Sequence, residues 1–212
     1  MEMVRMENGY KNFRNYTVLN NVSFVCNSGE ITGFVGENGS GKSVIFKCLC
    51  GFYQLDRGEI YINGKRRENA YETLHNAGIM IEAPAFIEQY SGLKNLELLY
   101  CIENKPDRKH LIDIMKLVGL NPKNRTRVGR YSMGMKQRLA IAQMIMEEKE
   151  IYIFDEPMNG LDKRGVVEIR NLIKNLKEQG KTILLASHNK EDIRILCDKV
   201  YELDNGTIHE LK

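Results

Sequence analysis

The stretch that decides the fold of this chain is Gly36-Glu37-Asn38-Gly39-Ser40-Gly41-Lys42-Ser43. It matches the phosphate-binding pattern G-x-x-x-x-G-K-[ST] at every fixed position. The apolar run 31–35 before it predicts a buried strand, and residues 44–50 predict a helix that stops at Gly51. A strand, a glycine-rich loop and a helix are the context in which this pattern binds nucleotide phosphates. The alternative is a plain glycine-rich turn, and the flanking elements make it the weaker interpretation.

Each residue type in the loop has its own task in such a site. Glycines let the backbone wrap closely around an anion, because no Cβ stands in the way. The N–H groups of the loop and of the helix N-terminus present partial positive charge to the phosphates. Lys42 is expected to reach the β- and γ-phosphates, and the Ser43 hydroxyl to ligate Mg²⁺. These residues predict a site for a nucleoside triphosphate with its magnesium.

Length and composition predict a single soluble globular domain. The chain has 212 residues, of which 42% are hydrophobic and 28% charged, and its formal net charge of +3 implies no large polyanionic partner. The densest basic run, residues 123–130, is more typical of a solvated loop than of a nucleic-acid patch. Neither a secretory signal nor a membrane-spanning apolar run is visible. We therefore expect a cytosolic chain, or one that reaches a membrane only through a partner.

Five cysteines, an odd number, argue against a disulfide framework and for a reducing compartment. Cys48 and Cys50 are two residues apart on a predicted helix, so their side chains point to different faces. We expect both to be small buried hydrophobic residues rather than metal ligands.

The order of patterns along the chain predicts an α/β fold interrupted by a helical insertion. Antiparallel strands are expected within residues 1–30, best at 18–26, followed by a strand at 58–62 with a turn at Asn63-Gly64. Further strands are expected at 77–81, 151–154, 182–186 and 200–203, and helices at 92–103, 107–118, from Ser132 to about 146, 163–177 and 190–197. Residues 1–83 and 150–212 would form a β lobe and a nucleotide-binding core, and residues 84–149 a helical subdomain, all within one domain spanning 1–212. We expect no C-terminal regulatory domain after the last strand.

A second group of candidate residues follows the apolar run 151–154, which ends in Asp155 and Glu156. Ligands of parallel β/α folds bind at the carboxyl ends of the strands, so these two acids should lie near the phosphate loop. Asp155 is expected to hold Mg²⁺ together with Ser43. Glu156 is placed to polarise a water for attack on the γ-phosphate. The alternative is an acidic strand end that is merely solvated.

His188 follows the predicted strand 182–186 and should lie at the same edge of the sheet. A single histidine is usually an ordinary surface or core residue. Its predicted place beside the γ-phosphate favours a role in sensing that phosphate.

With these features the chain resembles the nucleotide-binding subunits of ABC transporters over essentially its whole length. The resemblance implies a P-loop NTPase (RecA-like) core with a parallel sheet, an antiparallel β lobe and an all-helical inserted subdomain. It makes Gly36–Ser43 the Walker A loop and Ile151–Asp155 the Walker B strand, Glu156 the catalytic carboxylate and His188 the switch histidine. Asn159-Gly160-Leu161-Asp162 looks like the loop that crosses to the partner cassette.

The resemblance also points to an aromatic residue that stacks on adenine. Phe13 lies where the family has this residue, and Tyr16 is close enough to compete. A base needs a flat apolar partner, which favours Phe13, although either ring would also be unremarkable as a core or surface aromatic.

The segment Tyr131-Ser132-Met133-Gly134-Met135 stands where the family's signature motif, Leu-Ser-Gly-Gly-Gln, belongs. Ser132 and Gly134 are retained, and the other three positions differ. Ser132 begins a predicted helix, so its hydroxyl and the N–H groups after it can bind an anion. By resemblance, that anion is the γ-phosphate of ATP held by the opposite cassette. From the residues alone, a plain helix cap would be the preferred interpretation.

A further departure lies at Glu82, where the family usually has a glutamine that reports on the metal. Glu82 adds a negative charge near Mg²⁺, which could tighten metal binding or slow hydrolysis by repelling the attacking water. Both Glu82 and the variant signature resemble the cassettes of bacitracin and lantibiotic self-protection exporters.

The resemblance implies an ATPase that dimerises around two MgATP and drives export, including that of peptide antibiotics or drugs, through an integral membrane permease. The cassette would be peripheral on the inner face of the membrane, as a homodimer or a heterodimer, with no nucleic-acid partner. One alternative is a soluble cassette ATPase acting on ribosomes or DNA, but such proteins usually carry two cassettes or a long coiled coil. Another is a nucleotide-gated module that does not hydrolyse ATP, against which Lys42, Asp155, Glu156 and His188 argue.

Overall fold

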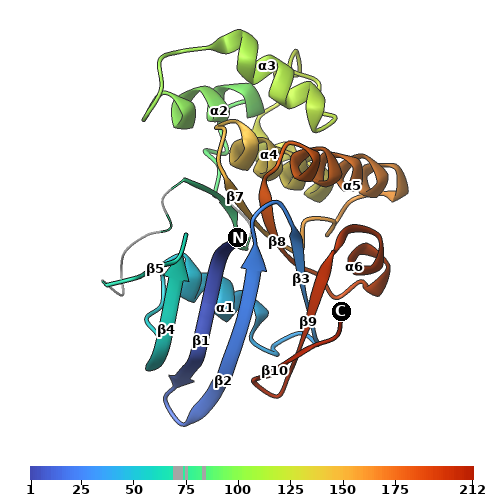
Figure 1. Ribbon diagram of the computed structural model, residues 1–212. Coiled ribbons are helices and arrows are strands. Elements are labelled where there is room, and N and C mark those ends of the chain that lie inside the picture. Colours follow the sequence, from blue (N-terminus) through green and yellow to red (C-terminus); the bar gives the residue numbers. More distant parts are fainter. Residues whose placement is uncertain (69–73, 75, 83–84) are drawn as a thin grey trace.

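Two β-sheets and six helices make up the part of the chain that the computed structural model describes, residues 1–68, 74, 76–82 and 85–212 (Figure 1). The strands are β1 (Glu2–Phe13), β2 (Tyr16–Asn27), β3 (Ile31–Val35), β4 (Arg57–Ile62), β5 (Lys65–Arg66), β6 (Ala77–Met80), β7 (Ile151–Asp155), β8 (Thr182–Ala186), β9 (Lys199–Asp204) and β10 (Thr207–Glu210). The helices are α1 (Lys42–Leu49), α2 (Gly92–Tyr100), α3 (Arg108–Leu117), α4 (Met133–Ile145), α5 (Lys163–Glu178) and α6 (Lys190–Leu196), with one 3-10 turn at Val128–Arg130.

The larger sheet has the strand order β10-β9-β3-β8-β7-β6. Its strands from β9 to β6 run parallel, and only β10 at the edge is antiparallel. Side chains alternate between its two faces, as a strand requires. On β7, Ile151 and Ile153 pack on the side of α1, whereas Tyr152 and Phe154 pack on the side of α4 and α5. Both faces are covered, which explains why the parallel strands read as continuous apolar runs.

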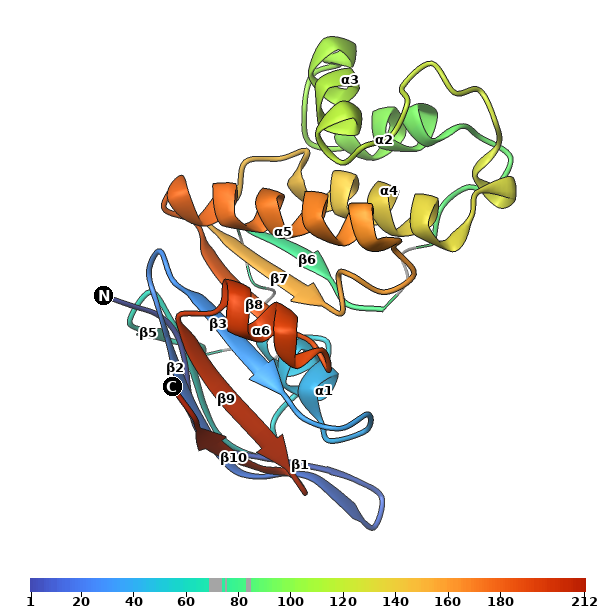
Figure 2. The same ribbon diagram turned by 90° about the vertical axis from the view of Figure 1, so that its right-hand side faces the viewer.

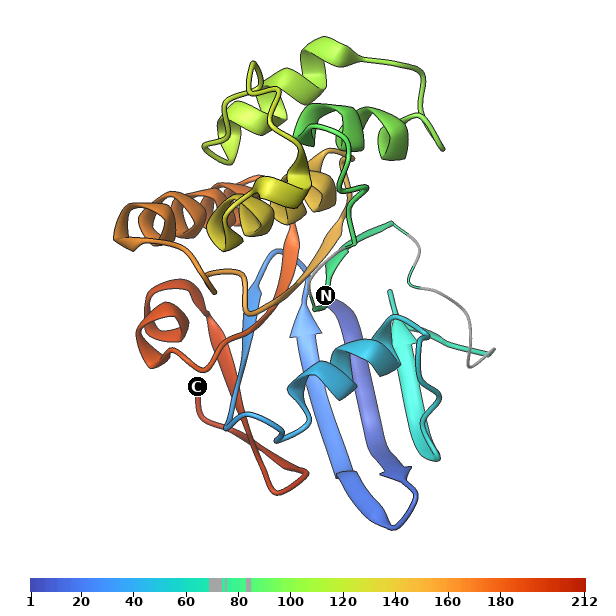
Figure 3. The same cartoon turned by 180° about the vertical axis from the view of Figure 1, so that it is seen from behind.

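The smaller sheet is antiparallel, with the order β2-β1-β4-β5, and is built around the long β1–β2 hairpin. Helix α1 runs across β1 and β2 between the two sheets (Figure 3). Helices α4, α5 and α6 lie on the opposite face of the larger sheet, and α2 and α3 lie beyond α4 (Figure 2). This arrangement confirms the predicted α/β fold with an antiparallel β lobe and a helical insertion. No helix in the described ranges is long and apolar enough to span a membrane.

Several predicted boundaries are corrected. Helix α2 ends at Tyr100, not residue 103; Cys101 is its C-cap, and the Asn104 side chain donates a hydrogen bond at 3.3 Å to the Tyr100 carbonyl. Helix α1 starts at Lys42, directly after Gly41, whose φ is 111°. Strand β10 was not predicted; it pairs with β9 through the turn Asn205-Gly206, in which both residues have positive φ.

Candidate functional site

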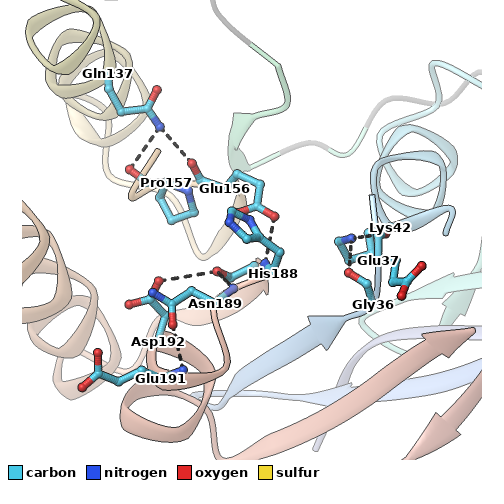
Figure 4. A network of polar contacts seen from close by, with 11 residues as sticks. Gly36, Glu37, Lys42, Gln137, Glu156, Pro157, His188, Asn189, Glu191 and Asp192 are labelled. Carbon is cyan, nitrogen blue, oxygen red and sulfur yellow. Dashed lines mark hydrogen bonds and ion pairs between the residues drawn. The ribbon is translucent and has the colours of Figure 1, made fainter. Parts of the chain in front are cut away.

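Lys42, the first residue of α1, points back over the phosphate loop (Figure 4). Its ammonium donates hydrogen bonds to the backbone carbonyls of Gly36 at 2.8 Å and Glu37 at 2.9 Å. Lys42 is only 6% exposed, and this burial lowers its pKa, while the charges of Glu156 and Asp155 act in the opposite direction. Phosphate oxygens of a bound nucleotide could therefore replace the two carbonyl oxygens as hydrogen-bond acceptors of the ammonium.

Glycines give the phosphate loop its open shape. Gly36, Gly39 and Gly41 all have positive φ, at 150°, 84° and 111°. A Cβ on Gly36 would lie 2.3 Å from the carbonyl oxygen of Leu203, whereas a Cβ on Gly39 would meet no atom within 4 Å. The Ser40 hydroxyl is buried and has no hydrogen-bond partner among the described residues. A loop with open space and an unpartnered hydroxyl fits a phosphate group.

Asp155 ends β7 beside the phosphate loop, as the sequence predicts. Burial raises the pKa of its carboxyl, a hydrogen bond from Ser43 acts against this, and the charge of Glu156 raises the pKa further. A carboxylate next to a serine hydroxyl is an oxygen-donor set that suits Mg²⁺. Within the described ranges, no three His, Cys, Asp or Glu side chains gather to hold a metal by themselves. Ser43 and Asp155 would thus share a magnesium with phosphate oxygens, where it would neutralise phosphate charge.

Glu156 and His188 are joined by two hydrogen bonds (Figure 4). The His188 backbone N–H donates to Glu156 Oε1 at 2.9 Å, and His188 Nδ1 lies 2.9 Å from Glu156 Oε2. The backbone of Glu156 has φ 52°, and Gln137 fixes it by donating from Nε2 to the carbonyls of Glu156 at 3.1 Å and Pro157 at 3.0 Å. His188 therefore contacts the carboxylate that is predicted to act as the base.

One cavity of about 280 Å³ brings most of these side chains together. Its lining includes Phe13, Lys42, Ser43, Asp155 and Glu156. The residues of the phosphate loop and of the acidic strand end, more than a hundred positions apart in the sequence, thus face the same space. This is the juxtaposition that binding and cleavage of a nucleoside triphosphate require.

The two aromatic candidates line different cavities. Phe13 lies in the cavity of Lys42, with its ring centroid 5.1 Å from that of Tyr53 in an edge-on contact. Tyr16 lines a neighbouring cavity of about 150 Å³, together with residues 37–40. Phe13 thus shares its cavity with Lys42 and Ser43, whereas Tyr16 lies beside the middle of the phosphate loop, and stacking of either ring on a base stays a prediction.

Ser132, Gly134 and Asp162 do not line the cavity of Lys42. Ser132 caps α4 by accepting a hydrogen bond from the Met135 N–H at 3.2 Å, and Asp162 caps α5 in the same way. Gly134 lies against Gly160, since a Cβ at 134 would be 2.8 Å from the Gly160 carbonyl oxygen. The predicted action of Ser132 and Gly134 on a nucleotide would need a second copy of the chain or a related cassette.

Glu82 follows β6 at the same edge of the sheet, where its carboxylate forms an ion pair with Lys47 of α1. It is not among the residues that line the cavity of Lys42. Its predicted contact with a metal stays a prediction.

Residues that the sequence did not indicate support the turn that carries His188. Asp192 is 1% exposed and accepts a hydrogen bond from Arg170 Nε at 2.7 Å. It also accepts a hydrogen bond from the Ser187 hydroxyl at 3.5 Å, and that hydroxyl accepts one from the Asn189 N–H at 3.1 Å. Arg170 of α5 thus anchors the segment around His188 through a buried ion pair.

Replacing Arg170 with alanine is expected to lower the free energy of unfolding by about 3–5 kcal/mol, because it leaves the Asp192 carboxylate buried and unpaired. The matched control is Arg164→Ala on the same helix, whose side chain is 87% exposed and pairs with Glu168. It should cost about 1 kcal/mol or less. Urea unfolding followed by circular dichroism measures both; equal losses would contradict the anchoring role of Arg170.

Comparison with known proteins decides the family. Residues 19–159 match the family model described as ABC transporter. The chain belongs to the ABC transporter family. It is 35% identical over 206 residues to the uncharacterized ABC transporter ATP-binding protein YybJ of Bacillus subtilis, covering 97% of this chain and 94% of YybJ.

Two relatives are named for the transport of peptide antibiotics. The lantibiotic transport ATP-binding protein SrtF of Streptococcus pyogenes is 32% identical, with 97% of this chain and 89% of SrtF covered. The bacitracin transport ATP-binding protein BcrA of Enterococcus faecalis is 33% identical, with 98% of this chain and 67% of BcrA covered. These relatives bear out the resemblance to the bacitracin and lantibiotic cassettes.

Solved ABC cassettes share the fold. A dimeric bacterial ABC transporter cassette superposes with a TM-score of 0.89 at 23% identity, covering 99% of this chain and 98% of that chain. Its post-hydrolysis form bound to ADP and Pi gives a TM-score of 0.88 at 24% identity, with the same coverage. As a member of the ABC family, the chain is an ATP-binding ATPase subunit, and the family favours the transporter over the ribosome- or DNA-directed alternative.

Proposed function

We propose that two cassettes, this chain with a second copy or a related chain, close face to face around two MgATP, and that hydrolysis drives export through an integral membrane permease. The observation that carries the proposal is the cavity in which Lys42 and Ser43 meet Asp155 and Glu156. Each ATP would be bound by the phosphate loop of one cassette and by Ser132 and Gly134 of the other.

The cleavage step follows from the position of Glu156. Its carboxylate takes a proton from the water that attacks the γ-phosphate, while Lys42 stabilises charge on the phosphate oxygens. His188 would release one carboxylate oxygen of Glu156 as the phosphate enters and then contact that phosphate. Phe13 would stack on the adenine, beside Tyr53.

Closure of the pair would be driven by differential affinity. A ligand shifts an equilibrium only as far as it binds one state more tightly. The exposed Ser132 at the start of α4 gains a phosphate partner only in the closed pair, so ATP favours closure and hydrolysis favours opening.

The named relatives suggest the cargo and the place of action. Since SrtF and BcrA are transport ATP-binding proteins for a lantibiotic and for bacitracin, we propose that the cargo is a peptide antibiotic or a similar amphipathic compound. The cassette would sit on the cytoplasmic face of the membrane, held by the permease.

Phosphate release from ATP, measured on the chain alone and with its co-purified partner, tests the proposal. We expect Mg²⁺-dependent release and co-purification with a hydrophobic membrane protein of several spans. Binding of ATP without phosphate release would support the non-hydrolysing module, and co-purification with ribosomes or DNA would support the soluble ATPase.

Changing Ser132 to alanine is expected to reduce hydrolysis by the assembled pair by roughly tenfold, since one charge-assisted hydrogen bond to the phosphate is lost. ATP affinity of the monomer should stay unchanged. The matched control is Ser91→Ala, because Ser91 caps α2 through the same kind of hydrogen bond, to the Lys94 N–H at 3.3 Å. Hydrolysis at several protein concentrations and ATP binding to dilute monomer are the measurements. Weaker ATP binding by monomeric Ser132→Ala would rule out the cross-chain role.

A further inference from the structure

The Glu82 carboxylate, which follows β6, is paired with the Lys47 ammonium by a hydrogen bond and an ion pair. Lys47 lies on α1 four residues after Ser43. Residues four apart on a helix share one face, one turn from each other. The cation that binds Glu82 is therefore one helical turn from the hydroxyl that would ligate magnesium.

Lys47 is held in place on more than one side. Its side chain is 20% exposed, and its ammonium lies 5.5 Å from the centre of the Tyr53 ring. Its backbone carbonyl accepts hydrogen bonds from the N–H groups of Phe52 at 2.9 Å and Tyr53 at 3.2 Å. Lys47 is thus a fixed counter-ion rather than a freely moving surface lysine.

The backbone conformation of Glu82 also restricts the direction of its side chain. Its φ of 63° lies in the left-handed region, which is unusual for a residue with a side chain. This conformation and the Lys47 contact together set the direction of the carboxylate. Glu82 thus has a defined place in the part of the chain that the structure describes.

Glu82 lies near the carboxylate that would bind the metal: Met80 pairs with Phe154, so Glu82 and Asp155 follow neighbouring parallel strands at one edge of the sheet. The hydrogen bond that Lys47 donates to Glu82 is the main cause of the raised pKa of Lys47, because it stabilises the charged ammonium. An unpaired Glu82 would be a third negative charge beside Asp155 and Glu156, which would tighten metal binding and repel the water that Glu156 activates.

We infer that Lys47 is a positioning residue that holds the Glu82 carboxylate away from the magnesium site. The pair Lys47–Glu82 then carries no net charge, as a glutamine would, and the metal is shared by Ser43, Asp155 and the nucleotide. The inference rests on the proposed function, because it concerns the metal site of ATP hydrolysis. It also explains how the chain accommodates a glutamate at position 82.

The test is a double-mutant cycle of Lys47→Met and Glu82→Gln on the full chain. Methionine keeps the apolar length of the lysine stem and removes its charge. Mn²⁺ is the probe, titrated in the presence of a non-hydrolysable ATP analogue and followed by electron paramagnetic resonance. We expect Lys47→Met to tighten Mn²⁺ binding by roughly three- to tenfold and to lower the maximal rate of hydrolysis to a similar extent.

Further variants distinguish a positioning role of Lys47 from a merely structural one. Lys47→Arg should behave like the wild type, and adding Glu82→Gln to Lys47→Met should return Mn²⁺ affinity to the wild-type value. Lys174→Met, which removes an exposed charge on α5, is the matched control and should change nothing.

An unchanged Mn²⁺ affinity of Lys47→Met, or strictly additive effects in the cycle, would overturn the inference. A wild-type chain that binds the analogue with Mn²⁺ but releases no phosphate would instead overturn the proposed hydrolysis. The Mn²⁺ titration would still decide the role of Lys47 in that case, so the two failures are distinguishable.

Discussion

Replacing Glu156 with glutamine is expected to lower the rate of ATP hydrolysis by about 10²–10⁴-fold while ATP affinity stays close to that of the wild type. Glutamine has the shape of glutamate and can still accept the hydrogen bond from the His188 N–H, but its amide cannot take a proton from water. The groups predicted to bind the phosphates, Lys42 and the loop before it, are untouched. The substitution should therefore lower the rate of cleavage without lowering the affinity for ATP.

Single-turnover phosphate release and binding of a fluorescent ATP analogue measure the two quantities. Because cleavage is blocked, the variant should also accumulate as an ATP-bound dimer in size-exclusion chromatography. Glu178→Gln, an exposed position at the end of α5, is the matched control. A turnover equal to that of the wild type would exclude Glu156 as the base.

Lys42→Ala is expected to weaken ATP binding by about 10- to 100-fold, because hydrogen bonds to charged groups contribute about 1.5–3 kcal/mol each. The ammonium donates hydrogen bonds to the Gly36 and Glu37 carbonyls, and phosphate oxygens would replace these carbonyls as its partners. Alanine removes both the charge and the reach of the side chain. Hydrolysis should fall with binding, in contrast to Glu156→Gln.

Lys42 also donates hydrogen bonds to two carbonyls of the loop, so its replacement could destabilise the fold. Thermal unfolding of the variant must therefore be measured as well as its ATP affinity. Lys174→Ala is the control for the loss of one positive charge. A folded Lys42→Ala variant with wild-type ATP affinity would contradict the assignment of residues 36–43 as the phosphate site.

Much of the fold follows from short patterns in the sequence. Runs such as 151–154 and 183–186 are apolar at every position because helices or the second sheet cover both of their faces. The glycine loop between a strand and a helix predicts the phosphate cradle, because its geometry is local. Since parallel strands end at one edge, the meeting of Lys42 with Asp155 also follows from the sequence.

The contacts that sequence analysis missed join side chains that are far apart along the chain. Lys47 and Glu82 are separated by 35 positions, Gln137 and Glu156 by 19, and Arg170 and Asp192 by 22. The repeat of a helix or a strand does not connect residues so far apart in the sequence. Each residue, taken alone, therefore looks like an ordinary charged or amide side chain on the surface. The one available signal was the spacing of Lys47 from Ser43, which places both on one face of α1.

The early end of α2 was missed for a similar reason. Beyond its C-cap Cys101, both the backbone N–H and the side chain of Asn104 donate hydrogen bonds to the Tyr100 carbonyl, a contact that forms only once the chain has turned. In contrast, the Asn205-Gly206 dipeptide was visible, and it does connect β9 to β10. The short strand after it carries too few alternating apolar residues to be recognised.

The burial of the thiols has a practical consequence for spectroscopy. Burial raises the pKa of four of them, Cys26, Cys48, Cys50 and Cys197, to about 12, so almost no reactive thiolate forms at neutral pH. Cys101, directly after α2, is exposed. A maleimide spin label therefore has one attachment point on the unmodified sequence, within the helical region. Distances between two such labels would report directly how far the helical regions of paired cassettes approach each other when ATP is added.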